Sequence, residues 1–252
     1  MPKQQQETIE LRIKRQDRPD SKPYWEEFSL PYLPQSNVIS VLQDIQKNPI
    51  NKQKKQVKPV TWDSACLEEV CGSCSMVINK HVRQACSALI DRLHQPIELE
   101  PLSKFPVVRD LQVDRSRMFE ALKKIKGWVP IDGLNDLGPG EKILPKHQEI
   151  AYKLSTCMSC GCCVQACPSY AKDNNFIGAA AISQARLFNM HPVGKTLKNE
   201  RLDALADDGG LHTCGNAQVC TEVCPRGIPL TESIAVMGRQ VTFRMFSKFF
   251  ES

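Results

Sequence analysis

The spacing of its cysteines constrains this chain more than any other feature. Twelve cysteines occur among 252 residues, and they fall into three groups with short intervals inside each group. A secreted protein could join them as disulfides, but residues 1–6 resemble neither a signal peptide nor an organellar leader. A chain of this length can also bury a core without disulfides. Tightly spaced thiols in such a chain indicate metal ligands.

The first group places three thiols on one nine-residue loop, at Cys66, Cys71 and Cys74, and a fourth at Cys86. Structural zinc sites usually combine two separated pairs of cysteines. Three thiols on a single loop and a fourth farther along are typical of plant-type [2Fe–2S] centres. Gly72 allows the tight backbone that such a loop needs. We therefore predict a [2Fe–2S] centre, with zinc and inert thiols as the alternatives.

The second group is an unbroken C-x2-C-x2-C-x3-C-P run, the spacing of bacterial ferredoxins. Its residues are Cys157, Cys160, Cys163, Cys167 and Pro168. Cys162 lies inside the run but off its spacing. We interpret Cys162 as a small buried residue beside a cluster. The alternative is that it replaces Cys163 as a ligand.

The third group follows the same template with one gap. Cys214, Cys220 and Cys224 occupy three of its cysteine positions, but Ala217 stands where the second cysteine belongs. In two-cluster ferredoxins the fourth cysteine of each run ligates the other cluster. This crossing predicts a complete [4Fe–4S] site, made by Cys157, Cys160, Cys163 and Cys224. It leaves a second site with three thiolates, those of Cys167, Cys214 and Cys220.

A site with three thiolates does not hold the fourth iron of a cube firmly. We therefore predict [3Fe–4S] at the second site, next to Ala217. The alternative is a [4Fe–4S] cube whose fourth iron carries water or another ligand.

Hydrophobic patterning predicts an α+β chain with two domains. Alternating or β-rich segments favour four strands, at 8–14, 24–30, 75–79 and 97–102. A helical period favours one helix at 38–45, capped by Ser36 or Asn37. With the metal loop, they suit a β-grasp ferredoxin domain over residues 1–105. The pattern then becomes helical, which predicts an all-α, bacterial-ferredoxin-like domain over residues 106–252. In that domain Asp114 and Thr231 are the expected caps of the first and last helices.

Three clusters in one small chain indicate an electron relay, because each carries one electron at a time. The chain has no G-x-G-x-x-G motif after a strand and no apolar run long enough for a membrane helix. A flavin or substrate partner and a quinone-facing partner are therefore expected as separate chains. The formal charge of +5 is largely offset by bound clusters and their thiolates. We expect no nucleic-acid partner.

The order of these motifs resembles the iron–sulfur subunit of succinate dehydrogenase and fumarate reductase over essentially the whole chain. Supporting segments lie at 66–74, 105–116 and 224–227. The resemblance implies a flavoprotein with covalent FAD near the [2Fe–2S] domain and a membrane cytochrome b anchor at the [3Fe–4S] end. It implies electron transfer from FAD through [2Fe–2S], [4Fe–4S] and [3Fe–4S] to quinone. It also implies a peripheral position on the cytoplasmic face of the cytoplasmic membrane.

Two segments depart from the ubiquinone-linked members of that family. Those members carry Trp after the first Cys-Pro and His after the first cysteine of the second run, where this chain has 170–172 (Tyr-Ala-Lys) and Gly215. The departures favour the menaquinone-linked type with a dihaem cytochrome b. The physiological direction, succinate oxidation or fumarate reduction, stays open.

Other classes of protein remain as alternatives. One is an iron–sulfur subunit of the glycolate-oxidase or heterodisulfide-reductase type, which Ala217 disfavours because those chains often carry two complete runs. Another is a binding module that metal merely stabilises. The phenylalanine-rich segment 243–250 could pack against protein or lie at a bilayer interface, and we favour packing.

Overall fold

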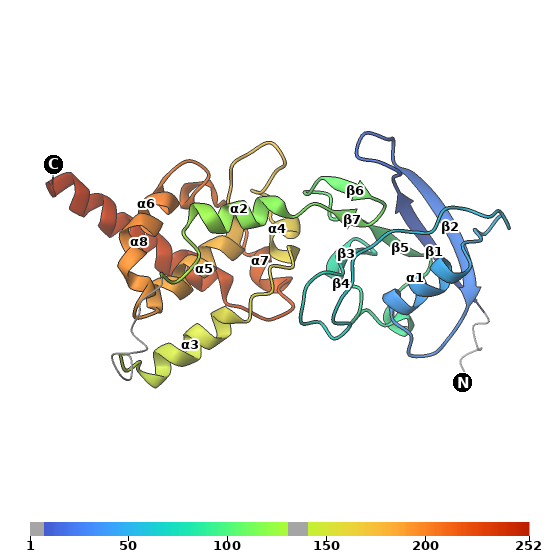
Figure 1. Ribbon diagram of the computed structural model, residues 1–252, viewed down its shortest axis with the longest axis horizontal. Helices are drawn as coiled ribbons and strands as arrows, with labels where there is room; N and C mark the ends of the chain where they lie inside the picture. Colours follow the sequence, from blue (N-terminus) through green and yellow to red (C-terminus); the bar gives the residue numbers. More distant parts are fainter. Residues whose placement is uncertain (1–7, 131–140, 252) are drawn as a thin grey trace. The chain divides into compact units, whose positions relative to one another are not determined.

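The structure, a computed structural model, describes residues 8–130 and 141–251 (Figure 1). Residues 1–6, on which the leader argument rests, lie outside that range. The chain forms two compact units, Met1–Arg115 and Ser116–Ser252. Sequence analysis divided the chain between residues 105 and 106. Residues 106–115 group with the first unit because Asp110, in the turn of their hairpin, is buried there against Arg15.

Among its described residues, the first unit is a mixed five-stranded sheet with one α-helix and a 3-10 helix at Ile90–Arg92, and a separate two-stranded hairpin follows the sheet. The sheet order is β2-β1-β5-β3-β4, with β1 and β5 parallel and the other neighbours antiparallel. The strands are β1 (Thr8–Arg15), β2 (Tyr24–Pro31), β3 (Ser75–Ile78), β4 (His81–Gln84), β5 (Ile97–Glu100), β6 (Val107–Arg109) and β7 (Gln112–Val113). This arrangement confirms the predicted fold of the N-terminal part.

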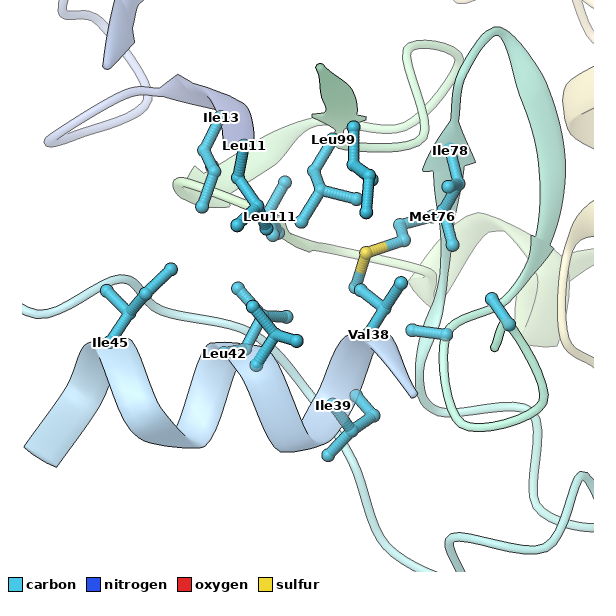
Figure 2. Packing of buried hydrophobic residues seen from close by; sticks show 14 of the residues in the cluster. Leu11, Ile13, Val38, Ile39, Leu42, Ile45, Met76, Ile78, Leu99 and Leu111 are labelled. Atoms are coloured by element: carbon cyan, nitrogen blue, oxygen red, sulfur yellow. The ribbon is translucent and has the colours of Figure 1, made fainter. Parts of the chain in front are cut away.

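Helix α1 (Val38–Lys47) covers the sheet because its apolar residues recur on one face. Figure 2 shows Val38, Leu42 and Ile45 directed toward side chains of β1, β3 and β5. The side chain of Asn37 caps the helix by accepting a hydrogen bond from the Ser40 N–H at 2.9 Å. The predicted helix and one of its two predicted caps are therefore confirmed.

A buried ion pair joins β1 to the turn of the β6–β7 hairpin. Arg15 and Asp110 are almost fully buried, and the Arg15 Nε lies 2.8 Å from Asp110 Oδ1. Arg15 also donates to the carbonyls of Lys58 and Pro59, while Asp110 accepts from the Thr61 N–H. Burial alone would lower the pKa of Arg15, but the hydrogen bond and charge of Asp110 raise it above its ordinary value. The pair fixes the segment that leads into the Cys66 loop.

The second unit is helical, as predicted. Its α-helices are α2 (Ser116–Lys124), α3 (Pro145–Ser155), α4 (Cys162–Ala166), α5 (Gly178–Met190), α6 (Lys198–Ala206), α7 (Val219–Glu222) and α8 (Leu230–Glu251). Two short 3-10 helices lie at Gly194–Leu197 and Leu211–Thr213. Helix α5 packs against α2, α3, α4, α6 and α8. Small residues along 178–181 are buried and allow this close approach.

One predicted cap of this unit is wrong. Helix α2 begins at Ser116, two residues after Asp114, whose role as its cap stays a prediction. Helix α8 begins at Leu230, so Thr231 lies within its first turn. The Thr231 N–H instead donates to the hydroxyl of Thr221 at 3.2 Å. One N–H group in the first turn of α8 is thus hydrogen-bonded by a side chain of α7. Local sequence does not reveal such a tertiary contact.

Candidate metal centres

The loop between α1 and β3 turns its amide groups toward two cysteine sulfurs. Leu67 and Glu69 adopt left-handed backbone conformations, with φ of 63° and 58°. The N–H groups of Glu68, Val70 and Cys71 all donate to the sulfur of Cys66, at 3.3 to 3.5 Å. Such a concave row of N–H groups stabilises negative charge. The strained backbone therefore serves a thiolate, which is a reason for strain to persist at a functional site.

Cys71 lies in the same loop, and its sulfur also accepts hydrogen bonds from backbone amides. Its sulfur accepts from the N–H groups of Cys66 at 3.5 Å and Ser73 at 3.4 Å. Burial opposes ionisation, but the hydrogen bonds from Ser73 and Cys66 outweigh it and lower the pKa of Cys71 to about 6. A depressed thiol pKa favours the thiolate form that a metal binds.

Cys74 and Cys86 lie deeper in the first unit. Both are buried, and the Cys74 thiol donates to the Gln84 side chain at 3.4 Å. Burial and then the hydrogen bond with Cys74 raise the pKa of Cys86 to about 11. A buried thiol of this kind becomes a thiolate when a metal neutralises its charge. The first unit thus holds two partly buried thiols on the loop and two fully buried ones. These are the four thiols that the [2Fe–2S] prediction names.

A hollow in the second unit is lined by the four thiols predicted for the [4Fe–4S] site, namely Cys157, Cys160, Cys163 and Cys224. Burial and the neighbouring thiols raise the pKa of Cys163 well above its ordinary value. Cys224 comes from the second cysteine run and the other three from the first, so this hollow is lined by the four thiols that the crossing groups together. Their ligation of a [4Fe–4S] cluster stays a prediction.

A second hollow is lined by the three remaining predicted thiols, Cys167, Cys214 and Cys220. Ala217 lines it as well, at the corner where a fourth thiol would stand in a complete run. Adjacent residues of α5 separate the two hollows, because Ala180 lines the first and Ala179 the second. Cys162 is fully buried and does not line either hollow. This position agrees with its interpretation as a packing residue.

Within residues 8–130 and 141–251, no three His, Cys, Asp or Glu side chains converge on a point that could hold one metal ion. The donors gathered at the predicted sites are cysteine thiols, the ligands that hold iron–sulfur clusters. The residues present therefore fit the iron–sulfur groups that their spacing predicts.

Residues other than cysteine also shape these sites, and spacing alone did not single them out. Arg115 donates to the carbonyls of Gly72 and Ser73 inside the first loop. In the second unit Arg117 donates to the carbonyls of Ala171, Asn174 and Phe176. Its guanidinium also lies 4.0 Å from the centre of the Tyr170 ring. Arg115 and Arg117 flank Ser116 in the chain, and both donate to backbone carbonyls.

Comparison with known proteins agrees with both regions. Residues 10–120 match the family described as a 2Fe-2S iron-sulfur cluster binding domain, and residues 153–228 match the 4Fe-4S dicluster domain. The succinate dehydrogenase iron-sulfur subunit of Bacillus subtilis is 57% identical over 248 residues, 98% of each chain. The chain belongs to the family of iron–sulfur subunits of succinate dehydrogenase and fumarate reductase.

More distant members support the same assignment. The fumarate reductase iron-sulfur subunit of Wolinella succinogenes is 28% identical and covers 88% of this chain and 91% of its own. A chain of the solved Sdh1 complex of Mycobacterium smegmatis in the apo form superimposes with a TM-score of 0.77 at 25% identity, covering 95% of this chain and 97% of that one. This succinate dehydrogenase-type subunit is accordingly an oxidoreductase component that transfers electrons.

The family and the matched domains also indicate the cofactors. The two matched domains carry [2Fe–2S] and [4Fe–4S] centres, and a [3Fe–4S] centre is typical of the iron–sulfur subunits of this family. In the described part of the chain, none of the helices combines the length and the apolar character needed to span a bilayer.

Proposed function

We propose that this chain is the electron-transfer subunit of a succinate:quinone oxidoreductase, placed between an FAD flavoprotein and a membrane quinone. The observation that supports it most is the sorting of eleven cysteines into one loop site and two adjoining hollows. Such a series is of use to an electron carrier and of little use to a protein that metal only stabilises. Bound clusters supply one-electron redox chemistry at each site.

The cysteines take the following roles in this proposal. The [2Fe–2S] ligands are Cys66, Cys71, Cys74 and Cys86. The [4Fe–4S] ligands are Cys157, Cys160, Cys163 and Cys224, and the [3Fe–4S] ligands are Cys167, Cys214 and Cys220. Loop amides stabilise the thiolates of the first site, and burial excludes water from Cys163 and Cys220 in the second unit.

Each unit exposes apolar side chains that suit a protein partner. Leu67 and Val70 lie about half exposed on the loop that carries Cys66 and Cys71. Exposed apolar residues beside a redox centre fit the docking of the flavoprotein there. The end of α8 exposes Phe243, Phe246 and Phe249, which fit contact with a membrane anchor subunit. The complex would then lie on the cytoplasmic face of the cytoplasmic membrane.

Menaquinone is the proposed acceptor, with the anchor as a dihaem cytochrome b that supplies most of the quinone site. The chain has the segment 170–172 (Tyr-Ala-Lys) and Gly215 where ubiquinone-linked members carry Trp and His. In addition, the Gly215 N–H donates to the Ser169 hydroxyl at 3.0 Å, so this backbone group is already engaged within the chain. Succinate oxidation is the proposed direction, because the 57% identical relative is a succinate dehydrogenase subunit. Quinol:fumarate reduction is the second candidate, favoured by the 28% identical fumarate reductase subunit.

Purification of the tagged chain from detergent-solubilised membranes tests this proposal. A flavoprotein with covalently bound FAD and a haem protein should copurify in constant ratio to the chain, together with succinate-dependent reduction of a menaquinone analogue. Isolation of the chain with neither partner from intact membranes would contradict the proposal. Equal reduction of ubiquinone and menaquinone analogues would contradict only the assignment of the quinone.

A further inference from the structure

Arg115 contacts the backbone of the [2Fe–2S] loop at two consecutive carbonyl groups. Its Nη1 donates to the Gly72 carbonyl at 2.7 Å, and its Nη2 donates to the Ser73 carbonyl. Both carbonyls lie between Cys71 and Cys74. The planar guanidinium presents paired N–H groups in a fixed geometry, which a lysine ammonium does not. This two-point contact is therefore specific to arginine.

The contact determines where a neighbouring N–H group points. The Gly72 carbonyl and the Ser73 N–H belong to one planar trans peptide and therefore point in opposite directions. The Ser73 N–H donates to the sulfur of Cys71 at 3.4 Å. By holding the carbonyl, Arg115 holds that N–H toward the sulfur. The positive φ of Gly72, 74°, gives the loop the turn that this orientation needs.

The hydroxyl of Ser75 reinforces the same arrangement, because it donates to the Gly72 carbonyl at 2.9 Å. Ser75 carries no charge, whereas the arginine guanidinium is always protonated. Reduction of an iron–sulfur centre adds one negative charge, and hydrogen bonds to sulfur and nearby charge set its potential. A fixed cation beside the loop thus favours the reduced form.

We propose that Arg115 is a positioning residue of the [2Fe–2S] centre, which orients the Ser73 amide toward Cys71 and raises the reduction potential through its charge. This inference rests on the ligation of the centre by Cys66, Cys71, Cys74 and Cys86 proposed above. It assigns a role to a residue outside the cysteine pattern.

The experiment is an EPR-monitored redox titration of the assembled complex carrying Arg115→Gln, Arg115→Lys or Arg12→Gln. Arg12 is a matched control because it is an arginine of the same unit that pairs with Glu98 and stacks on Trp25, away from the loop. Arg115→Gln should shift the reduction equilibrium about tenfold toward the oxidised form, about 59 mV for one electron. Arg12→Gln should leave the equilibrium within about twofold of the unsubstituted complex.

Arg115→Lys separates charge from geometry. It keeps the charge, so the potential should stay nearer to that of the unsubstituted complex than in Arg115→Gln. It loses the two-point contact, so the g-values or linewidth of the [2Fe–2S] signal should change. Equal potentials in Arg115→Gln and Arg12→Gln would overturn the electrostatic role, and an unchanged Arg115→Lys spectrum would overturn the positioning role. If Arg115→Gln does not assemble, the Arg115→Lys spectrum still decides the positioning role. Absence of a [2Fe–2S] signal from the unsubstituted complex would instead contradict the ligand assignment.

Discussion

The two units build their metal sites in different ways. In the first unit three thiols lie within nine residues, and the loop's own amides stabilise two of them. In the second unit each hollow combines thiols from two distant cysteine runs, such as Cys163 and Cys224. The first arrangement depends on local backbone conformation, and the second depends on the packing of the whole helical unit around α5.

This difference has a physical consequence for how each site fails. Damage to the Cys66 loop should leave the other two sites intact, because the loop belongs to the first unit and both hollows belong to the second. Damage to the helical packing should disturb both hollows together, because Ala179 and Ala180 are neighbours on α5.

Loss of a ligand gives the largest effect. Cys71→Ala should abolish the [2Fe–2S] signal and leave the other two, because its loop belongs to a separate unit. Cys224→Ala should abolish the [4Fe–4S] signal although Cys224 belongs to the second cysteine run. Iron content and EPR of the reduced complexes measure both. Loss of all three signals in Cys71→Ala would contradict the independence of the units.

Removal of the buried charge at Asp110 should destabilise the first unit. Asp110→Asn removes one of the two carboxylates that contact the buried Arg15 guanidinium and leaves Glu26 as the other, at a cost of about 1–3 kcal/mol. Glu100→Gln is the control, since its ion pair with Lys14 is partly exposed and contributes about 0–1 kcal/mol. Denaturant titration followed by the visible circular dichroism of the [2Fe–2S] centre provides the measurement. Similar midpoints for the two variants would show that Asp110 has no special role.

A methyl group at Gly209 should destabilise the second unit by about 2–4 kcal/mol. Gly209 has a φ of +71°, and an added Cβ would lie 2.0 Å from the Asn175 carbonyl oxygen. Gly227 is the control, because it also has a positive φ but its nearest neighbour, Lys153 Nζ, is 3.6 Å away. Gly227→Ala should cost only about 1 kcal/mol. On heating, Gly209→Ala should lose the [4Fe–4S] and [3Fe–4S] signals at a lower temperature than the unsubstituted complex. Its [2Fe–2S] signal should be retained.

The smallest effect concerns Asp203, which joins α6 to α8 through Arg244 and Lys248. Burial opposes ionisation, but the two cations outweigh it and lower the pKa of Asp203. Its stabilisation is therefore present above its ordinary pKa and is lost only as the pH falls through the lowered value. Asp203→Asn should weaken hydrogen-exchange protection of α8 by about 0.2–1 kcal/mol, equally at pH 8 and pH 5. A difference in α8 protection between Asp203→Asn and the unsubstituted chain that disappears between pH 8 and pH 5 would contradict this account.

Sequence patterns predicted most of the fold and the grouping of the cysteines. Alternation and the helical period located β1, β2 and α1 because each has one face buried in the same core. Strand β4, His81–Gln84, escaped prediction because its residues do not alternate and it is held by pairing with β3. The capping of α8 was not predicted, because the accepting hydroxyl belongs to Thr221 on another helix.

The same distinction applies to the candidate sites. Cysteine spacing reflects the fixed size of a cluster, so the thiols of both units were grouped from sequence. Arg115 and Arg117 act on backbone carbonyls far along the chain, and such contacts leave no spacing pattern. The residues that position these sites therefore required the structure.

The central claim is that the two hollows are crossed ferredoxin sites, of which one lacks a thiol at Ala217. EPR of the air-oxidised Ala217→Cys complex tests it most directly. The added thiol should retain the fourth iron, so the [3Fe–4S] signal should disappear and a [4Fe–4S] signal should appear on reduction. Ala217→Ser is the matched control, and it should keep the [3Fe–4S] signal. A [3Fe–4S] signal in Ala217→Cys as strong as that of the unsubstituted complex would contradict the account.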